Sequence, residues 1–272
     1  MGVVNTTPDS FSDGGQLMVG DGVHAEAAVS HGLSLLAAGC DIVDVGGEST
    51  RPGADPVPPA EEASRVVPVI RGLAAAGAVV SVDTRNASVA AAAIDAGASI
   101  VNDVTALADP DMAGLVADTG AGVVLMHMQG DPQTMQDEPR YGDDVAEVAA
   151  YLAARSDAAV AGGVSPEAIC VDPGIGFGKT TDHNLAILGH LDRFALLGYP
   201  VLVGTSRKGF IARTLESGGL ETPPPEERDP GTMATVALAI AAGAAVVRVH
   251  DGAGAVQAAR IADAIVRTRR GR

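Results

Sequence analysis

The sequence predicts a single (β/α)8 barrel, an α/β fold spanning residues 1–272 with its active site at the C-terminal mouth of the strands. Short apolar runs alternate with longer Ala- and Leu-rich stretches, and there are eight such runs. The length of 272 residues is close to the roughly 250 residues typical of this barrel. Aromatic residues make up only 3% of the chain, so the core must be aliphatic, as suits parallel strands buried on both faces.

The elements follow from the hydrophobic periodicity. We expect strands at residues 2–4, 42–46, 79–83, 99–103, 122–127, 168–172, 200–204 and 245–250. Helical periodicity lies between them, for example at 24–38, 60–76, 86–96, 144–162 and 252–268. Several helices are predicted to stop at Ala-Gly pairs, because glycine readily adopts the left-handed conformation of a helix C-terminus.

Two stretches interrupt this alternation without forming a linker. The Pro-rich residues 218–230 are flanked by helical patterns of the same barrel, so we expect a surface excursion between two helices. The polar residues 128–143 follow the fifth strand and are predicted to form a loop that could act as a mobile lid.

Composition excludes several classes of partner and compartment. A net charge of −16 argues against nucleic acid and anionic membranes as partners. The most apolar window, residues 233–247, is shorter than the roughly 20 residues of a membrane span. The N-terminus lacks the features of a signal peptide, and Cys40 and Cys170 show no metal-ligand spacing. A reducing, cytoplasmic location is the resulting expectation.

Polar side chains follow every expected strand. The stretch "VVRVHDG" (246–252) begins as a buried strand and then places Arg248, His250 and Asp251 at its end. The other strands are followed by Asn5; Glu48 and Arg51; Asp83; Asn102 and Asp103; His127; Asp172; and Ser206, Arg207 and Lys208. Any one of these, such as Asp103, is equally consistent with an ordinary polar loop. Because all eight ends open on one mouth of a barrel, the whole set predicts a shared pocket.

The acidic and amide groups leave three chemistries open. Asp83, Asn102 and Asp172 could accept and donate the hydrogen bonds of an aminopyrimidine edge. They could instead bind Mg²⁺, or cap their own loops. The basic groups suit an anion, because the seventh and eighth strands of such barrels frequently supply a phosphate site. Of these, we expect Lys208 and Arg248 to be functional and Arg207 to be a solvated surface charge.

Eight motifs together resemble the dihydropteroate synthase family, and they cover almost the whole chain in order. They are "NTTPDSFSDGG", "IVDVGGESTRPGA", "SVDT", "IVND", "LMHMQGDPQTMQ", "DPGIGFGKT", "GTSRKGF" and "RVHD". Pterin-dependent corrinoid methyltransferases share the Asp/Asn/Asp pocket but are not expected to carry the last two motifs together. Position 6 is threonine where the family usually has valine.

The resemblance implies a transferase of folate synthesis that joins 6-hydroxymethyl-7,8-dihydropterin pyrophosphate to 4-aminobenzoate. It implies catalytic roles for Asp13, Asp172 and Lys208, and a pterin site of Asp83, Asn102, Met126, Asp172, Lys208 and Arg248. Asn5, Arg248 and His250 would bind pyrophosphate, with Mg²⁺ as cofactor beside Asn5. Thr50, Arg51, Pro52, Phe177, Ser206 and Lys208 would form the 4-aminobenzoate site.

The same resemblance implies small-molecule substrates and a homodimer formed through outer helices. Sulfonamides are expected inhibitors, since "GFGKT" (176–180) carries no added residues of the kind expected in resistant forms. Two alternatives remain, a non-catalytic paralogue and a pterin-dependent methyltransferase. The presence of Arg51, Lys208 and the pocket carboxylates counts against the first, and the basic pyrophosphate residues count against the second.

Overall fold

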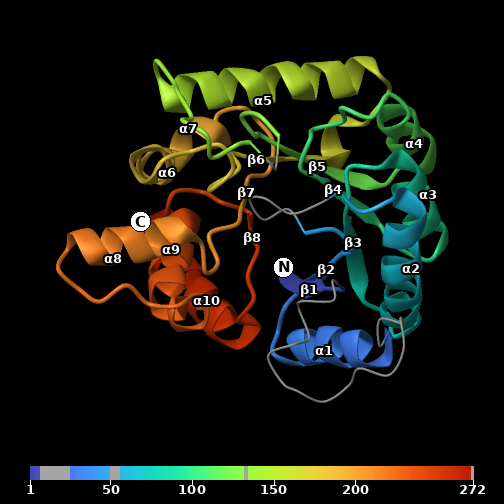
Figure 1. Cartoon of the computed structure of the whole chain (residues 1–272), viewed down its shortest axis with the longest axis horizontal. Helices are drawn as coiled ribbons and strands as arrows, with labels where there is room; N and C mark the ends of the chain where they lie inside the picture. The colour runs from blue at the N-terminus through green and yellow to red at the C-terminus, as the bar shows by residue number, and fades with distance from the viewer. Residues whose placement is uncertain (7–24, 50–55, 132–133, 271–272) are drawn as a thin grey trace.

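Eight parallel strands surround a central core in the part of the chain that the structure, a computed structural model, describes: residues 1–6, 25–49, 56–131 and 134–270 (Figure 1). The strands are β1 (Gly2–Asn5), β2 (Ile42–Gly46), β3 (Val79–Asp83), β4 (Ile100–Asp103), β5 (Gly122–Met126), β6 (Ile169–Asp172), β7 (Leu202–Val203) and β8 (Val246–Val247). The bounds of β1 to β6 each lie within one residue of the predicted range, whereas β7 and β8 are shorter than predicted.

Backbone contacts close these strands into a ring. β1 to β6 form one ladder in sequence order, and β7 pairs with β8. The Val171 N–H donates to Pro200 O at 2.9 Å, which joins β6 to the start of β7. On the other side the Val3 N–H donates to Val249 O and the Val249 N–H donates to Met1 O, both at 3.0 Å. The predicted (β/α)8 architecture is therefore confirmed.

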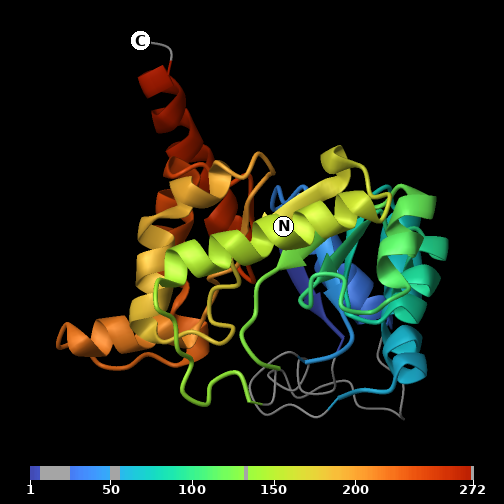
Figure 2. The same ribbon diagram turned by 90° about the horizontal axis from the view of Figure 1, so that it is seen from above.

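Helices cover the outside of the ring. They are α1 (Ala25–Ala37), α2 (Pro59–Ala75), α3 (Ala87–Asp95), α4 (Met112–Thr119), α5 (Asp144–Ala161), α6 (Thr181–Gly189), α7 (Leu191–Ala195), α8 (Gly209–Ser217), α9 (Asp229–Ala241) and α10 (Gly252–Arg270). In Figure 1, α1 to α4 flank one side of the barrel and α6 to α10 the other. The Pro-rich residues 218–230 lead from α8 to α9, as predicted, and α10 extends beyond the neighbouring helices (Figure 2).

The barrel interior contains a layer from alternate strands. Ile42, Ile100, Cys170 and Val246 come from β2, β4, β6 and β8, and they pack with Met1, Val124 and Leu202. Such four-residue layers are how this fold fills its centre, and they explain why Cys170 lies within an apolar run. Both cysteines are free. No helix in the described residues is long and apolar enough to cross a bilayer.

Candidate active site

One row of the sheet brings three predicted residues together at the C-terminal mouth. Asn5 pairs in register with Gly46, Gly46 with Asp83, and Asp83 with Asn102. A Cβ built at Gly46 would lie 3.7 Å from Asp83 Oδ2 and 3.8 Å from Asn5 Oδ1. The glycine therefore leaves these two polar groups facing a common space, which a larger residue would fill.

Arg248 connects this row to a carboxylate that the sequence analysis missed. Its Nε donates to Asp44 Oδ2 at 2.6 Å and its Nη2 donates to Asp83 Oδ2 at 2.7 Å. Asn102 Nδ2 donates to the same Asp44 oxygen at 3.1 Å. Asp44 is completely buried, and its Oδ1 has no hydrogen-bond partner among the described residues. A single guanidinium therefore lies between the buried carboxylate of Asp44 and the largely buried carboxylate of Asp83.

The two carboxylates compete for that one positive charge. Burial raises the pKa of Asp83 to about 7, Arg248 acts against this rise, and the neighbouring Asp44 adds to it. A carboxyl group with this pKa changes its charge near neutral pH. Asp83 is thus poised between accepting hydrogen bonds as a carboxylate and carrying a proton.

A second group of predicted residues lies across the mouth. Met126 and Asp172 are paired in register on β5 and β6, and both are buried. Asp172 Oδ1 accepts a hydrogen bond from the Gly174 N–H at 2.7 Å. Burial raises the pKa of Asp172, while Lys208 and the Gly174 N–H lower it.

Lys208 faces Asp172 from the start of α8, where it precedes Gly209. Its Nζ donates to Ile175 O and lies 4.5 Å from the centre of the Phe177 ring, in cation–π geometry. Burial lowers the pKa of Lys208 to about 8, and Asp172 acts in the opposite direction. Lys208 therefore lies between Asp172, predicted to bind the pterin, and the Phe177 ring, predicted to bind 4-aminobenzoate.

Ser206 and His250 meet at the ends of the seventh and eighth strands. Ser206 Oγ lies 2.9 Å from His250 Nδ1 and accepts from the His250 N–H at 3.1 Å. The structure thus places the predicted pyrophosphate histidine beside the predicted 4-aminobenzoate serine.

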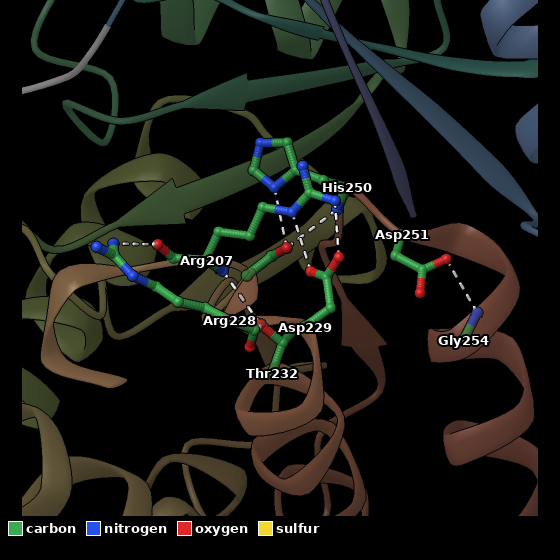
Figure 3. A network of polar contacts seen from close by, with 8 residues as sticks. Arg207, Arg228, Asp229, Thr232, His250, Asp251 and Gly254 are labelled. Atoms are coloured by element: carbon green, nitrogen blue, oxygen red, sulfur yellow. Dashed lines mark hydrogen bonds and ion pairs between the residues drawn. The ribbon is translucent and has the colours of Figure 1, made fainter. Parts of the chain in front are cut away.

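Arg207 corrects one prediction. It was expected to be a solvated surface charge, but its Nε and Nη2 donate to both oxygens of Asp229 at 2.9 and 2.7 Å. Its backbone N–H donates to Thr232 Oγ1, and its carbonyl accepts from Arg228 (Figure 3). Arg207 also has a positive φ of 60°. The sequence does not reveal this partner, because Asp229 lies 22 positions later, where the Pro-rich excursion ends and α9 begins. This ion pair therefore helps to hold the loop between β7 and α8, which carries Ser206 and Lys208.

Other polar residues at the strand ends bond within the scaffold. Asp103 accepts from Thr105 and from the Leu107 N–H, and Asp251 Oδ1 accepts from the Gly254 N–H. Glu48 accepts from Arg85. These side chains therefore behave as ordinary polar loop residues, the alternative given above for Asp103. The predicted residues Asp13, Thr50, Arg51 and Pro52 lie outside the described part of the chain.

Lys179 is a further charged residue near the mouth that the sequence patterns did not predict. Its side chain is 1% exposed, and its Nζ lies 2.9 Å from His127 Nδ1. Two features of the sequence could have pointed to Asp44 and Lys179. Asp44 is a charge in the middle of an apolar strand, and Lys179 is one of only two lysines in the chain, the other being Lys208.

The fold and this site together define a barrel enzyme whose mouth can hold a flat, hydrogen-bonding ring and an anionic group. Comparisons with known proteins narrow this class. The family described as "Pterin binding enzyme" matches residues 1–250. The dihydropteroate synthase of Mycobacterium leprae is 48% identical over 266 residues, covering 97% of this chain and 92% of that protein.

Solved structures agree with the sequence relatives. The Xanthomonas albilineans dihydropteroate synthase with 4-aminobenzoic acid has a TM-score of 0.87 and 47% identity, covering 97% of this chain and 91% of that one. The Yersinia pestis enzyme in a sulfonamide drug complex has a TM-score of 0.89 and 39% identity, covering 97% and 92%. The chain belongs to the dihydropteroate synthase family of pterin-binding enzymes.

Proposed function

We propose that this chain condenses 6-hydroxymethyl-7,8-dihydropterin pyrophosphate with 4-aminobenzoate, releasing pyrophosphate and forming 7,8-dihydropteroate. One observation carries the proposal: two opposed sets of polar groups occupy a single barrel mouth. Asp83, Asn102 and Arg248 form one set, and Asp172 and Lys208 form the other. Family membership supports the same reaction.

The pterin would lie between these two sets. Its aminopyrimidine edge donates N–H groups that the carboxylates of Asp83 and Asp172 can accept, while Asn102 can both donate and accept. Met126 supplies an apolar wall, and a planar guanidinium such as that of Arg248 can stack on a flat ring. Arg248 forms an ion pair with Asp83 in this structure. A bound pterin would therefore share the Asp83 carboxylate with Arg248.

The pyrophosphate would lie beside Asn5, Arg248 and His250. Cationic and N–H donors in this position stabilise the negative charge that develops on a leaving group. The C–O bond to pyrophosphate breaks with its electron pair leaving on oxygen. The remaining methylene cation is delocalised into the pterin and is stabilised by the buried carboxylate of Asp172, with Asp13 proposed to assist.

The residues fit a magnesium ion that arrives with the substrate. No group of three or more His, Cys, Asp or Glu side chains that could hold a metal occurs among the described residues. Mg²⁺ commonly keeps several waters and binds through one or two protein oxygens plus substrate phosphates. The Oδ1 of Asn5 faces the mouth beside Asp83 and could supply one such oxygen. A bound Mg²⁺ would neutralise pyrophosphate charge.

The second substrate would approach from the side of Phe177, Ser206 and Lys208, with Thr50, Arg51 and Pro52 proposed to complete its site. The aryl amine uses its lone pair to form the new C–N bond and then loses a proton to solvent. A weakly basic amine needs positioning more than activation, and stacking beside Phe177 provides orientation.

The direct test is pyrophosphate release by the purified chain with the dihydropterin pyrophosphate, Mg²⁺ and 4-aminobenzoate. Release that requires 4-aminobenzoate supports the proposal. Lys208→Ala should abolish it, whereas Arg213→Ala, which removes an exposed cation from the same helix, should not. Pterin binding without turnover would instead favour a non-catalytic paralogue. Methyl transfer from a methylated pterin without pyrophosphate release would favour the methyltransferase alternative.

Sulfonamides are proposed to compete with 4-aminobenzoate. The Y. pestis relative has been solved with a sulfonamide drug. In this chain Phe177 and Lys208, two residues of the proposed 4-aminobenzoate site, lie in contact. Competitive inhibition against 4-aminobenzoate, and not against the pterin substrate, is the expected pattern.

A homodimer is proposed through the outer face of α9 and α10. Leu238, Ile261 and Ile265 are 69%, 65% and 51% exposed, and they line a shared apolar groove. Burying such side chains against a second copy would be favourable. Sedimentation should show a dimer that Ile261→Asp dissociates.

The two free cysteines support the further proposal of a cytoplasmic, reducing location.

A further inference from the structure

The loop after β6 is held by four side chains: two come from the segment between β5 and α5, one comes from the start of α8, and one belongs to the loop itself. Four successive backbone carbonyls of this loop each accept a hydrogen bond from a different side chain. The carbonyls of Ile175, Gly176, Phe177 and Gly178 accept, in that order, from Lys208 Nζ, Gln136 Nε2 at 2.8 Å, Lys179 Nζ at 3.0 Å and Tyr141 Oη at 2.7 Å. No regular secondary structure holds these carbonyls, so their geometry depends on the donors.

Alternating glycines make this arrangement possible. Gly174, Gly176 and Gly178 have φ values of 67°, 86° and 60°. A Cβ at Gly174 would lie 1.9 Å from His127 O, and one at Gly178 would lie 2.4 Å from Gln129 O. The loop is therefore pressed against the segment that follows β5, and its carbonyls point in several directions.

Lys179 is the most deeply buried of the four donors. Besides Phe177 O, its Nζ contacts His127 Nδ1 at 2.9 Å and His127 O at 3.4 Å. Three acceptors match the three N–H groups of an ammonium ion. His127 must then be neutral with its proton on Nε2, in agreement with its pKa, which burial and Lys179 lower to about 3. Burial lowers the pKa of Lys179 itself to about 7, and Asp172 acts against this change.

His127 gives Lys179 a rigid support. Its backbone N–H donates to Asp172 O at 2.9 Å, and its ring packs edge-on against Tyr151 with centroids 4.9 Å apart. Lys179 thus joins the fixed end of β5 to the loop that carries Phe177. On the other side of that loop, Lys208 holds Ile175 O and covers the Phe177 ring.

We propose that Lys179 is a positioning residue for the second substrate, fixing Phe177 in the wall of the 4-aminobenzoate site through the Phe177 carbonyl and His127. This inference rests on the proposed function. It predicts a selective effect, because the pterin side of the mouth retains Lys208 and the Gly174 N–H as partners of Asp172. A residue needed only for folding would lower stability without separating the two substrates.

The test is steady-state kinetics of the full chain and its Lys179→Met variant, an unbranched apolar replacement that removes all three N–H donors. We expect the KM for 4-aminobenzoate to rise about tenfold, the effect of losing a hydrogen bond to a charged group. The dissociation constant of 6-hydroxymethyl-7,8-dihydropterin should change by less than about threefold, since Asp172 keeps Lys208 and the Gly174 N–H, which act on it more strongly than Lys179 does.

Each outcome has a distinct meaning. An unchanged KM for 4-aminobenzoate in a folded variant, or an equal loss of pterin binding, overturns the inference. If Lys179→Met does not fold, Lys179→Gln carries the test, because it keeps a polar N–H donor but is shorter and lacks the ammonium charge. It should show a smaller rise in the same KM, and no rise overturns the inference. Absence of turnover in the wild-type chain would instead refute the proposed function.

Discussion

Arg248 and Asp44 lie 204 positions apart in the chain, yet Arg248 Nε donates to Asp44 Oδ2 across 2.6 Å. The contact joins the eighth strand to the second across the mouth of the barrel. Since the same guanidinium also binds Asp83, one partly buried cation is shared by two carboxylates. Electrostatic interactions are strong where water is excluded, so this triad should control how the mouth responds to pH.

Pterin binding should strengthen as pH rises toward neutrality. The pKa of Asp83 is raised to about 7 by burial, so below that value the group holds a proton that it must release to accept the ring's N–H groups. Affinity should therefore rise by up to about tenfold per pH unit below this pKa and level off above it. Calorimetry with 6-hydroxymethyl-7,8-dihydropterin between about pH 5 and 7 would measure this, a range that lies below the pKa of about 8 of Lys208.

The control for this titration is Asp83→Asn, which has no proton to release. Its residual affinity should be nearly independent of pH over the same range. A wild-type affinity that is flat with pH would contradict the assignment to Asp83.

Asp44→Asn should move that pH dependence to lower pH. The negative charge of Asp44 raises the pKa of Asp83, and an amide of the same shape removes the charge. We expect the midpoint of the affinity curve to fall by roughly one pH unit. Asp41→Asn, an exposed change at the start of the same strand, should leave the midpoint in place. Identical midpoints in all three proteins would show that Asp44 does not influence the site electrostatically.

Arg207→Ala should destabilise the chain more than removal of an exposed ion pair does. Arg207 and Asp229 are 32% and 21% exposed and form two hydrogen bonds, so we expect a loss of about 1 kcal/mol in the free energy of unfolding. Arg267→Ala breaks a pair with Asp263 whose side chains are 79% and 46% exposed, and should have no measurable effect. Urea denaturation would compare them, and equal stabilities would contradict a role for Arg207 in anchoring its loop.

Gly178→Ala should be far more harmful than Gly219→Ala. Both glycines have positive φ, 60° and 83°, so both variants incur the roughly 1–2 kcal/mol cost of a left-handed conformation. No atom of the described part of the chain lies within 4 Å of a Cβ at Gly219, whereas a Cβ at Gly178 would meet Gln129 O at 2.4 Å. Gly178→Ala should therefore lose about 3 kcal/mol or more and raise the KM for 4-aminobenzoate. Thermal unfolding and kinetics would test this, and similar losses in both variants would show that the loop can shift.

The architecture was predictable because its signals are local. Strand-length apolar runs alternating with helical periodicity determined the barrel, and β2, β3 and β5 begin within one residue of their predicted starts. The position of Asp83, Asn102 and Asp172 at the mouth followed from the same reasoning, since parallel strands present their C-terminal ends together. The family resemblance then supplied candidate roles that neither composition nor spacing could provide.

The partners of the charged residues were decided only by the tertiary structure. Periodicity marks Asp44 as part of an apolar strand but does not say what its carboxylate meets, and its partner Arg248 is brought near only when β8 closes against β1. The sequence does not show that Arg207 pairs with Asp229, which lies 22 positions later at the end of the Pro-rich excursion, and Lys179 meets His127 only because two loops pack at the mouth. A charged side chain in a barrel can be stabilised by a partner far away in sequence, so its burial and its pKa are properties of the closed ring.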